Sequence, residues 1–305
     1  MSMLASKVQM DLVKAIVRDD LVLPTLPEVA LNIRKAAENP EISVSNLSKV
    51  IGRDTALAAR LIKVVNSPLL RALYEVTDLH TAITRLGVNY SSNLAIGLVM
   101  EQIFHARSPV VESKMRDVWR QSLEVAGVSY AFCRRYTSLK PDQAALGGLV
   151  HQIGVLPILI YAEEHNELLA DPVSLNHVIE RIHPVIGDKL LAVWEFPEML
   201  LKLPGQYQDV GRESKAIDYI DLVQIATVFC EQRDTPTLSH NLNELHAFKR
   251  LKLDADSELF QQTFPTPLHN PLIQPLRKSM VNKRRQRVHN NEARARRYAC
   301  NRRTA

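Results

Sequence analysis

The stretch LPTLPEVALNIRKAAENPEISVSNLSKVIGRDTALAARLIKVVNSPLL, residues 23–70, repeats a pattern of helix starts followed by apolar ladders. A pair of prolines precedes apolar residues spaced four apart, at Val29, Ile33 and Ala37. Proline suits the first turn of a helix, and a spacing of three or four residues gives a helix one apolar face. The stretch therefore predicts helices rather than strands.

Capping residues divide this stretch into separate helices. Ser43 and Asp54 are each placed to cap a helix, because their side-chain oxygens can accept from the first free amides. The second of these helices has Leu57 and Leu61 on one stripe and stops at residues 66–68, Asn-Ser-Pro, since proline cannot continue it. That turn has two interpretations: a local helix end, or a surface that faces a second part of the molecule.

Helical patterns continue through most of the chain, and no stretch shows the period-two alternation of a strand. Further helices are predicted over residues 78–86, 90–104, 110–136, a segment that starts at Asp142 and contains GGLVHQIG (147–154), 174–180, a segment that starts at His183-Pro184, and 216–231. The fold class predicted is all-α.

The net charge of +5 is unevenly distributed. Residues 275–305 hold eleven of the 38 Lys and Arg residues but one of the 33 Asp and Glu residues, so they carry +10 and the rest of the chain −5. A body of that sign is not typical of nucleic-acid binding. Residues 265–305, rich first in proline and then in arginine, have no apolar stripe, and we expect a disordered tail.

The basic tail has two interpretations that its sequence leaves open. It could bind nucleic acid or an acidic partner by charge alone, or it is an extension under no structural constraint. The candidate binding residues are Arg284, Arg285, Arg287, Arg294, Arg296 and Arg297.

Several features favour a cytoplasmic protein without a membrane span. The N-terminus is too charged for a secretory signal, and three distant cysteines do not form a disulfide or zinc pattern. Cys133 and Cys230 lie in apolar helical patterns and are interpreted as core thiols. The most apolar run, residues 146–162, is interrupted by polar residues and falls short of the ~18 apolar residues that a span needs. The pair Glu163-Glu164 that follows this run is interpreted as solvated surface.

Residues 23–70, followed in order by VWRQSLEVAG (118–127), GGLVHQIG (147–154) and HPVIGDKLLAVWEFP (183–197), resemble the HDOD family. This family comprises signal-associated relatives of the HD-superfamily metal-dependent phosphohydrolases. The resemblance covers about residues 21–232. It implies an N-terminal helical lobe (1–107) packed on an HD-like helical bundle (108–264), followed by the tail (265–305), in a protein of bacterial signalling type.

The resemblance also indicates where the metal ligands of the catalytic relatives would fall. Those relatives use a first histidine, a His-Asp pair, further histidines and a distal aspartate. The corresponding positions here are Gln121, His151 with Gln152, His183, Gln206 within residues 206–208, and Thr227. A hydrolytic centre needs anionic oxygens to offset a divalent cation, and an amide supplies none. The site is therefore interpreted as vestigial, with His151 and His183 as weak metal candidates and no cofactor expected.

Two local alternatives stay open for the remaining polar residues. His151 is interpreted first as a packed core histidine with a local hydrogen bond. Alternatively, Gln121, His151, Gln152 and His183 form a neutral hydrogen-bonded cluster, since an amide can satisfy an imidazole without an ion.

The function predicted is that of a non-catalytic HDOD signalling protein, with no enzyme activity, whose two lobes form a groove for an unidentified signalling partner. The first alternative is a metal-dependent phosphohydrolase (a phosphodiesterase) with an atypical site around His151 and His183. The second alternative is a nucleic-acid-binding regulator that works through the tail.

Overall fold

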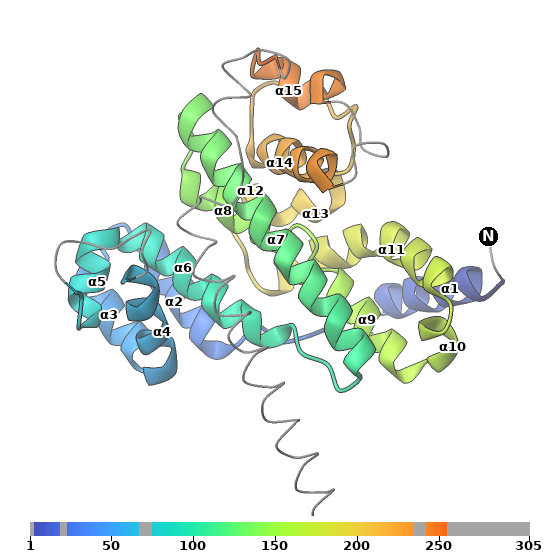
Figure 1. The fold of residues 1–305 in the computed structure, drawn as a ribbon, viewed down its shortest axis with the longest axis horizontal. Helices are drawn as coiled ribbons and strands as arrows, with labels where there is room; N and C mark the ends of the chain where they lie inside the picture. The colour runs from blue at the N-terminus through green and yellow to red at the C-terminus, as the bar shows by residue number, and fades with distance from the viewer. Residues whose placement is uncertain (1–2, 19–22, 67–74, 235–241, 255–305) are drawn as a thin grey trace, which may run out of the picture.

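The computed structural model describes residues 3–18, 23–66, 75–234 and 242–254, and within these it contains helices and no strand (Figure 1). The all-α prediction is confirmed. The helices are α1 Met3–Arg18, α2 Glu28–Glu38, α3 Val44–Gly52, α4 Thr55–Val65, α5 Leu79–Leu86, α6 Val88–Met100, η1 Glu101–Ile103, α7 Pro109–Tyr136, α8 Pro141–Val150, α9 Val155–Glu164, α10 Asn166–Leu169, α11 Pro172–Val193, α12 Glu198–Leu201, α13 Leu203–Gln206, α14 Tyr219–Asp234, η2 Leu242–Glu244 and α15 His246–Arg250.

The predicted helix starts in the first third are confirmed by their capping hydrogen bonds. The Ser43 hydroxyl accepts from the Asn46 amide at 3.1 Å, and the Asp54 carboxylate accepts from the Leu57 amide at 2.9 Å. Helix α4 ends at Val65, as residues 66–68 predict, although residues 67 and 68 lie outside the described part. These helices begin where short polar side chains satisfy their free amides.

Two of the predicted helix boundaries are wrong. Helix α8 ends at Val150, and residues 151–154 form a turn before α9, so GGLVHQIG spans a junction instead of lying in one helix. The helices predicted at 174–180 and from His183-Pro184 are one helix, α11, which is capped by Asp171 and continuous through Pro184. Pro184 removes the amide that would reach the Glu180 carbonyl, but Glu180 is exposed and water can replace that donor.

The long helix α7 runs through the centre of the molecule, with α8 packed along it (Figure 1). Helices α2–α6 gather on one side, whereas α1 lies on the other side against α11. The N-terminal helix therefore packs on the second half of the chain, while the predicted lobe boundary at residues 107 and 108 stays a prediction. Buried apolar residues from α1 to α15 form one continuous core.

Polar contacts also join the two halves of the chain. The Trp194 indole donates to the Pro24 carbonyl at 3.0 Å, and Arg34 on α2 binds both the backbone oxygen and the carboxylate of Glu195. Glu163, predicted as solvated surface, is half-buried and accepts from the Ser108 amide at the start of α7. The prediction for Glu163 is wrong because the start of α7 lies against the end of α9, where the Glu163 carboxylate accepts from a backbone amide.

One stretch of the described residues, 141–164, is long and apolar enough by composition to cross a membrane. Its apolar window is 83% buried inside the protein, where it forms α8 and α9. This burial is typical of core helices. The predicted core thiols Cys133 and Cys230 are both buried as well.

Candidate functional site

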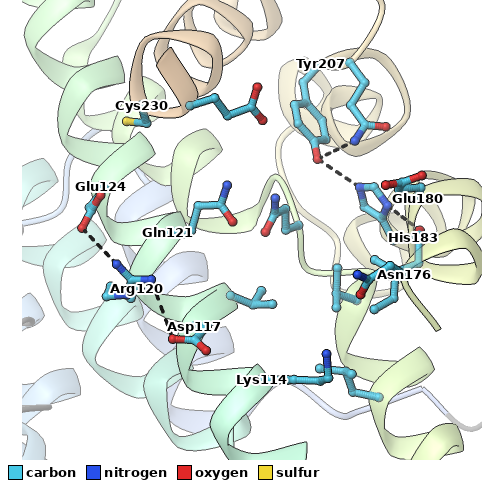
Figure 2. A pocket seen from close by; sticks show the side chains of 17 residues that line it. Lys114, Asp117, Arg120, Gln121, Glu124, Asn176, Glu180, His183, Tyr207 and Cys230 are labelled. Atoms are coloured by element: carbon cyan, nitrogen blue, oxygen red, sulfur yellow. Dashed lines mark hydrogen bonds and ion pairs between the residues drawn. The ribbon is translucent and has the colours of Figure 1, made fainter. Parts of the chain in front are cut away.

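A cavity of about 500 Å³ lies in the second half of the chain, between helices α7, α9, α11 and α14 and the residues that follow α13 (Figure 2). Three predicted site residues line this central cavity: Gln121 from α7, Gln152 from the turn after α8, and His183 from α11. Val118, Val155, Leu159 and Ile179 form its apolar walls. Figure 2 shows Gln121 and His183 facing each other across the opening.

Tyr207 connects the polar side chains at the inner end of the central cavity. The Nδ1 of His183 lies 2.7 Å from the Ile179 carbonyl and must donate to it, so the Nε2 accepts from the Tyr207 hydroxyl at 3.0 Å. The Gln208 amide donates to the same hydroxyl at 3.2 Å. Burial lowers the pKa of His183. Burial also raises the pKa of Tyr207, and a hydrogen bond with Gln152 offsets only part of this increase. The His183 imidazole and the Tyr207 phenol are therefore neutral near pH 7, like the glutamine amides beside them.

His151 lies fully buried beneath this network. Its Nδ1 donates to the Gly148 carbonyl at 2.7 Å, and its ring meets the Tyr207 ring edge-on with centroids 4.9 Å apart. Its Nε2 has no hydrogen-bond partner among the described residues. Burial lowers the pKa of His151 to about 4, with His183 as a further, smaller cause, so this imidazole is also neutral.

Close backbone contacts fix the positions of these side chains. Gly154 in the turn lies so near α11 that a Cβ would overlap the His183 carbonyl oxygen and come within 2.6 Å of the Gly187 amide nitrogen. A Cβ on Gly187 would in turn lie 2.5 Å from the Pro204 Cβ, just before Tyr207. The two glycines therefore bring the turn, α11 and α13 together at the site.

Charged residues surround the mouth of the central cavity. Asp117 and Glu124 on α7 share Arg120, at 3.7 and 4.0 Å. Lys114, Glu180 and Glu231 complete the ionised groups, so the lining has four carboxylates against two cations. Asp117 and Glu180 are exposed at the mouth and Glu124 is buried, whereas the imidazoles lie inside among neutral amides and the Tyr207 phenol.

The remaining predicted positions do not line the central cavity. Gln206 is exposed and accepts from Arg212 at 3.1 Å, while the Thr227 hydroxyl donates to the Val223 carbonyl within α14 at 2.9 Å. Of the predicted cluster of Gln121, His151, Gln152 and His183, the last two bond to Tyr207 and His151 packs against its ring. Gln121 lines the same cavity from α7. Tyr207 could have been singled out because it stands inside the 206–208 segment. The candidate tail arginines lie outside the described residues.

The donor set does not fit the divalent metal that HD-type hydrolysis uses. The lone pair of His183 is engaged by Tyr207, so of the two imidazoles at this site only that of His151 keeps an acceptor, its Nε2, without a partner among the described residues. The carboxylates of Asp117 and Glu124 pair with Arg120, and the described residues contain no group of three or more His, Cys, Asp or Glu side chains arranged around a metal position. Tight sites use three or four strong ligands, and the described residues at this site do not supply them.

The helical bundle and its pair of buried imidazoles place the protein among HD-like folds. The HDOD domain model matches residues 23–209, and the chain belongs to the HDOD family. The shared fold confirms the expected HD-like bundle in the second half.

Solved structures agree with this assignment. A Shewanella amazonensis SB2B protein with the provisional name metal-dependent phosphohydrolase is similar to the chain at 27% identity and a TM-score of 0.73, over 89% of this chain and 98% of that one. An HDOD domain protein of unknown function from Geobacter sulfurreducens shares the fold at 17% identity and a TM-score of 0.64, over 91% and 96% of the two chains.

A curated relative extends well beyond the matched region. An uncharacterized protein of Treponema pallidum is 24% identical over 196 residues, which are 59% of this chain and 36% of that protein. The chain thus spans about a third of the length of this relative.

Proposed function

We propose that this HDOD protein is a non-catalytic signalling protein that acts by binding a partner protein at the mouth of the central cavity. The observation that carries the proposal is the bond from Tyr207 to His183 Nε2, which occupies an imidazole lone pair that a metal would need. The family resemblance sets neutral Gln121 and Gln152, both in the cavity lining, at the positions where the catalytic relatives have a histidine and an aspartate. Without anionic ligands, a cation has little to neutralise its charge and no activated water.

Partner binding is favoured by the form of the site. The central cavity is open to solvent, combines apolar walls with polar groups, and lies on helices that close contacts hold in place. Such pre-formed concave sites suit recognition, since little ordering is needed on binding. We therefore place the partner at the central cavity in the second half of the chain, instead of at the groove between the two lobes that the sequence predicted.

Metal content and turnover test the non-catalytic assignment. The full chain, supplied with Mn²⁺ or Mg²⁺, is assayed for bound metal by mass spectrometry and for hydrolysis of a simple phosphodiester. We expect substoichiometric metal and the same background turnover as His183→Ala. Stoichiometric metal together with turnover that His151→Ala or His183→Ala abolishes would show a phosphohydrolase, the second candidate that the name of the Shewanella protein favours.

A restored variant provides the matched control for this measurement. Gln121→His, Gln152→Asp and Tyr207→His together return three strong donors to the central cavity and free the His183 lone pair. Metal uptake by this variant, with unchanged circular dichroism, would show that the ligand set limits binding in the native chain. Partner contact is tested separately, with a photo-crosslinking residue at Asn176 in the cavity lining and another at exposed Glu198 outside it.

A further inference from the structure

Helix α15 lies beyond the residues that the HDOD domain model matches, yet it contacts the stretch of chain that carries Tyr207. The match ends at residue 209, and α15 packs on α14 (Figure 1). The His246 amide at the start of α15 donates to the Val210 carbonyl at 3.5 Å. Residues 207–212, here called the connecting segment, therefore touch the central cavity at one end and α15 at the other.

Arg250 on α15 binds both α14 and the connecting segment. Its guanidinium donates to the two carboxylate oxygens of Asp221 on α14, at 3.2 and 2.6 Å, and to the Arg212 carbonyl at 3.1 Å. Asp221 is fully buried, and a buried carboxylate needs such charged donors because it has lost its water. Arg212 donates to the same carboxylate at 2.7 Å, so one acid joins α14, α15 and the connecting segment.

Helix α14 also holds the cavity end of the connecting segment. The Gln224 side-chain amide donates to the carbonyls of Tyr207 and Asp209, at 3.2 and 2.5 Å. The Tyr207 hydroxyl in turn donates to the His183 Nε2. A continuous series of hydrogen bonds and helical backbone therefore runs from Arg250 through α14 and the connecting segment to the inner end of the central cavity.

We propose that α15 is a latch on the central cavity: its docking through Arg250 holds Tyr207 against His183, and its release frees Tyr207 and opens the inner end of the cavity. A five-residue helix is not stable by itself, so α15 keeps its place through contacts with α14 and the connecting segment. Displacement of Tyr207 frees the His183 acceptor beside that of His151, so the open form suits a partner that inserts a hydrogen-bond donor. The inference rests on the proposed function only in that the partner uses this cavity.

Chemical labelling of His183 in the full-length protein measures this opening. Diethyl pyrocarbonate acylates a neutral imidazole nitrogen with a free lone pair, and the tryptic peptide 182–189 contains His183 as its one histidine. The labelling rate is compared in the native chain, in Arg250→Met and in Arg60→Met. Arg60 is the matched control outside the cavity lining, because it too donates to a buried carboxylate, that of Glu101, and to a backbone carbonyl, that of Leu98.

We expect Arg250→Met to label at His183 about tenfold faster than the native chain, since hydrogen bonds to an ionised partner change an equilibrium by about that factor. The labelling rate follows the population of the open form. Arg60→Met should label His183 at the native rate. Arg250→Lys keeps the charge but loses the paired donors to the carboxylate, so its rate should lie between those of the native chain and Arg250→Met.

Equal labelling of His183 in the native chain and Arg250→Met would overturn the latch, as would an equal rise in Arg60→Met, which indicates loosening of the whole fold.

Tyr207→Phe tests the same coupling from the other end and leaves the Arg250 contacts intact. Coupling is reciprocal, so loss of the Tyr207 hydroxyl bond should loosen α15 as much as release of α15 weakens that bond. Hydrogen–deuterium exchange of residues 242–254 should therefore be faster in Tyr207→Phe, while exchange in α4 stays at the native rate. Unchanged exchange in residues 242–254 would overturn the proposal even where Arg250→Met fails to fold. Neither measurement contains a partner or measures turnover, so failure here is distinct from failure of the proposed function.

Discussion

The His151 side chain, directly after α8, has a buried Nε2 atom that accepts no hydrogen bond from the described residues. The ring is fully buried, and charging it would place a cation beside the neutral Tyr207 and His183. Burial therefore lowers its pKa from 6.5 to about 4. The folded state binds this proton less readily than the unfolded chain, so the contribution of His151 to stability is complete above pH 6.5 and is lost as the pH falls towards 4.

The pH dependence of unfolding tests this assignment. Between pH 7 and pH 4 the native chain should lose about 3 kcal/mol of unfolding free energy through His151, because each unit of pKa shift corresponds to about 1.4 kcal/mol. His151→Gln should be less stable at pH 7 but should show a shallower slope in this window, with the residual slope due to His183, whose pKa is also lowered. Urea unfolding at several pH values gives both slopes, and identical slopes would contradict the assignment.

At the scale of single residues, three of the positions predicted from the sequence come together in the structure, while their role as a site stays a prediction. Gln121, Gln152 and His183 meet in one cavity because the family pattern fixes their order on three elements. The connecting role of Tyr207 was missed, since adjacent side chains in 206–208 point in different directions and the sequence does not reveal which one turns inward. The carboxylates at the mouth were missed because they come from separate helices.

The turn between α8 and α9 depends on Gly154 more than on any capping side chain. A methyl group there would overlap the backbone of α11 at His183, and neither backbone can move without breaking helical hydrogen bonds. Helix starts such as Ser43 and Asp54 were predictable because their signals are local. The end of α8 and the continuity of α11 were not, because they depend on contacts between segments about thirty residues apart.

Gly154→Ala is therefore expected to destabilise the protein by about 3 kcal/mol, through overpacking against backbone. The matched change is Gly52→Ala at the end of α3, where the new Cβ would lie 3.8 Å from the Leu79 side chain in ordinary contact. That variant should be neutral or more stable by up to about 1 kcal/mol, owing to helix propensity. Thermal unfolding followed by circular dichroism measures both. Equal stability of the two variants would show that the turn can shift away from α11.

At the scale of the whole molecule, α2 is fastened to the end of α11 by a buried arginine. Arg34 is 5% exposed and binds the Glu195 backbone oxygen and carboxylate, while the Trp194 indole binds the Pro24 carbonyl. One core runs from α1 to α15 beneath these contacts. The resemblance predicted two packed lobes, but it could not indicate that α1 crosses over to the second.

Arg34→Met should lower the unfolding free energy by about 2–3 kcal/mol, as hydrogen bonds to a charged group in a part-buried site are lost. Lys35→Met is the control, because the neighbouring cation lies 3.8 Å from the same Glu195 carboxylate but is 61% exposed, and its loss should cost less than about 1 kcal/mol. Circular dichroism and tryptophan fluorescence should report a single coincident urea transition in each protein. Two separated transitions would show that the halves unfold independently.

The close approach of α7 and α8 sets the width of the central cavity from outside it. A Cβ on Gly148 would lie 2.6 Å from the Ala126 amide nitrogen, so the two helices touch backbone to backbone. Gln121 precedes Ala126 on one helix, and Gln152 follows Gly148 beyond the other. The distance between the Gln121 and Gln152 side chains therefore depends on Gly148 and Ala126, which lie more than a helical turn away. A larger residue at either position would push α7 and α8 apart and widen the cavity, while every side chain that lines the cavity stays the same.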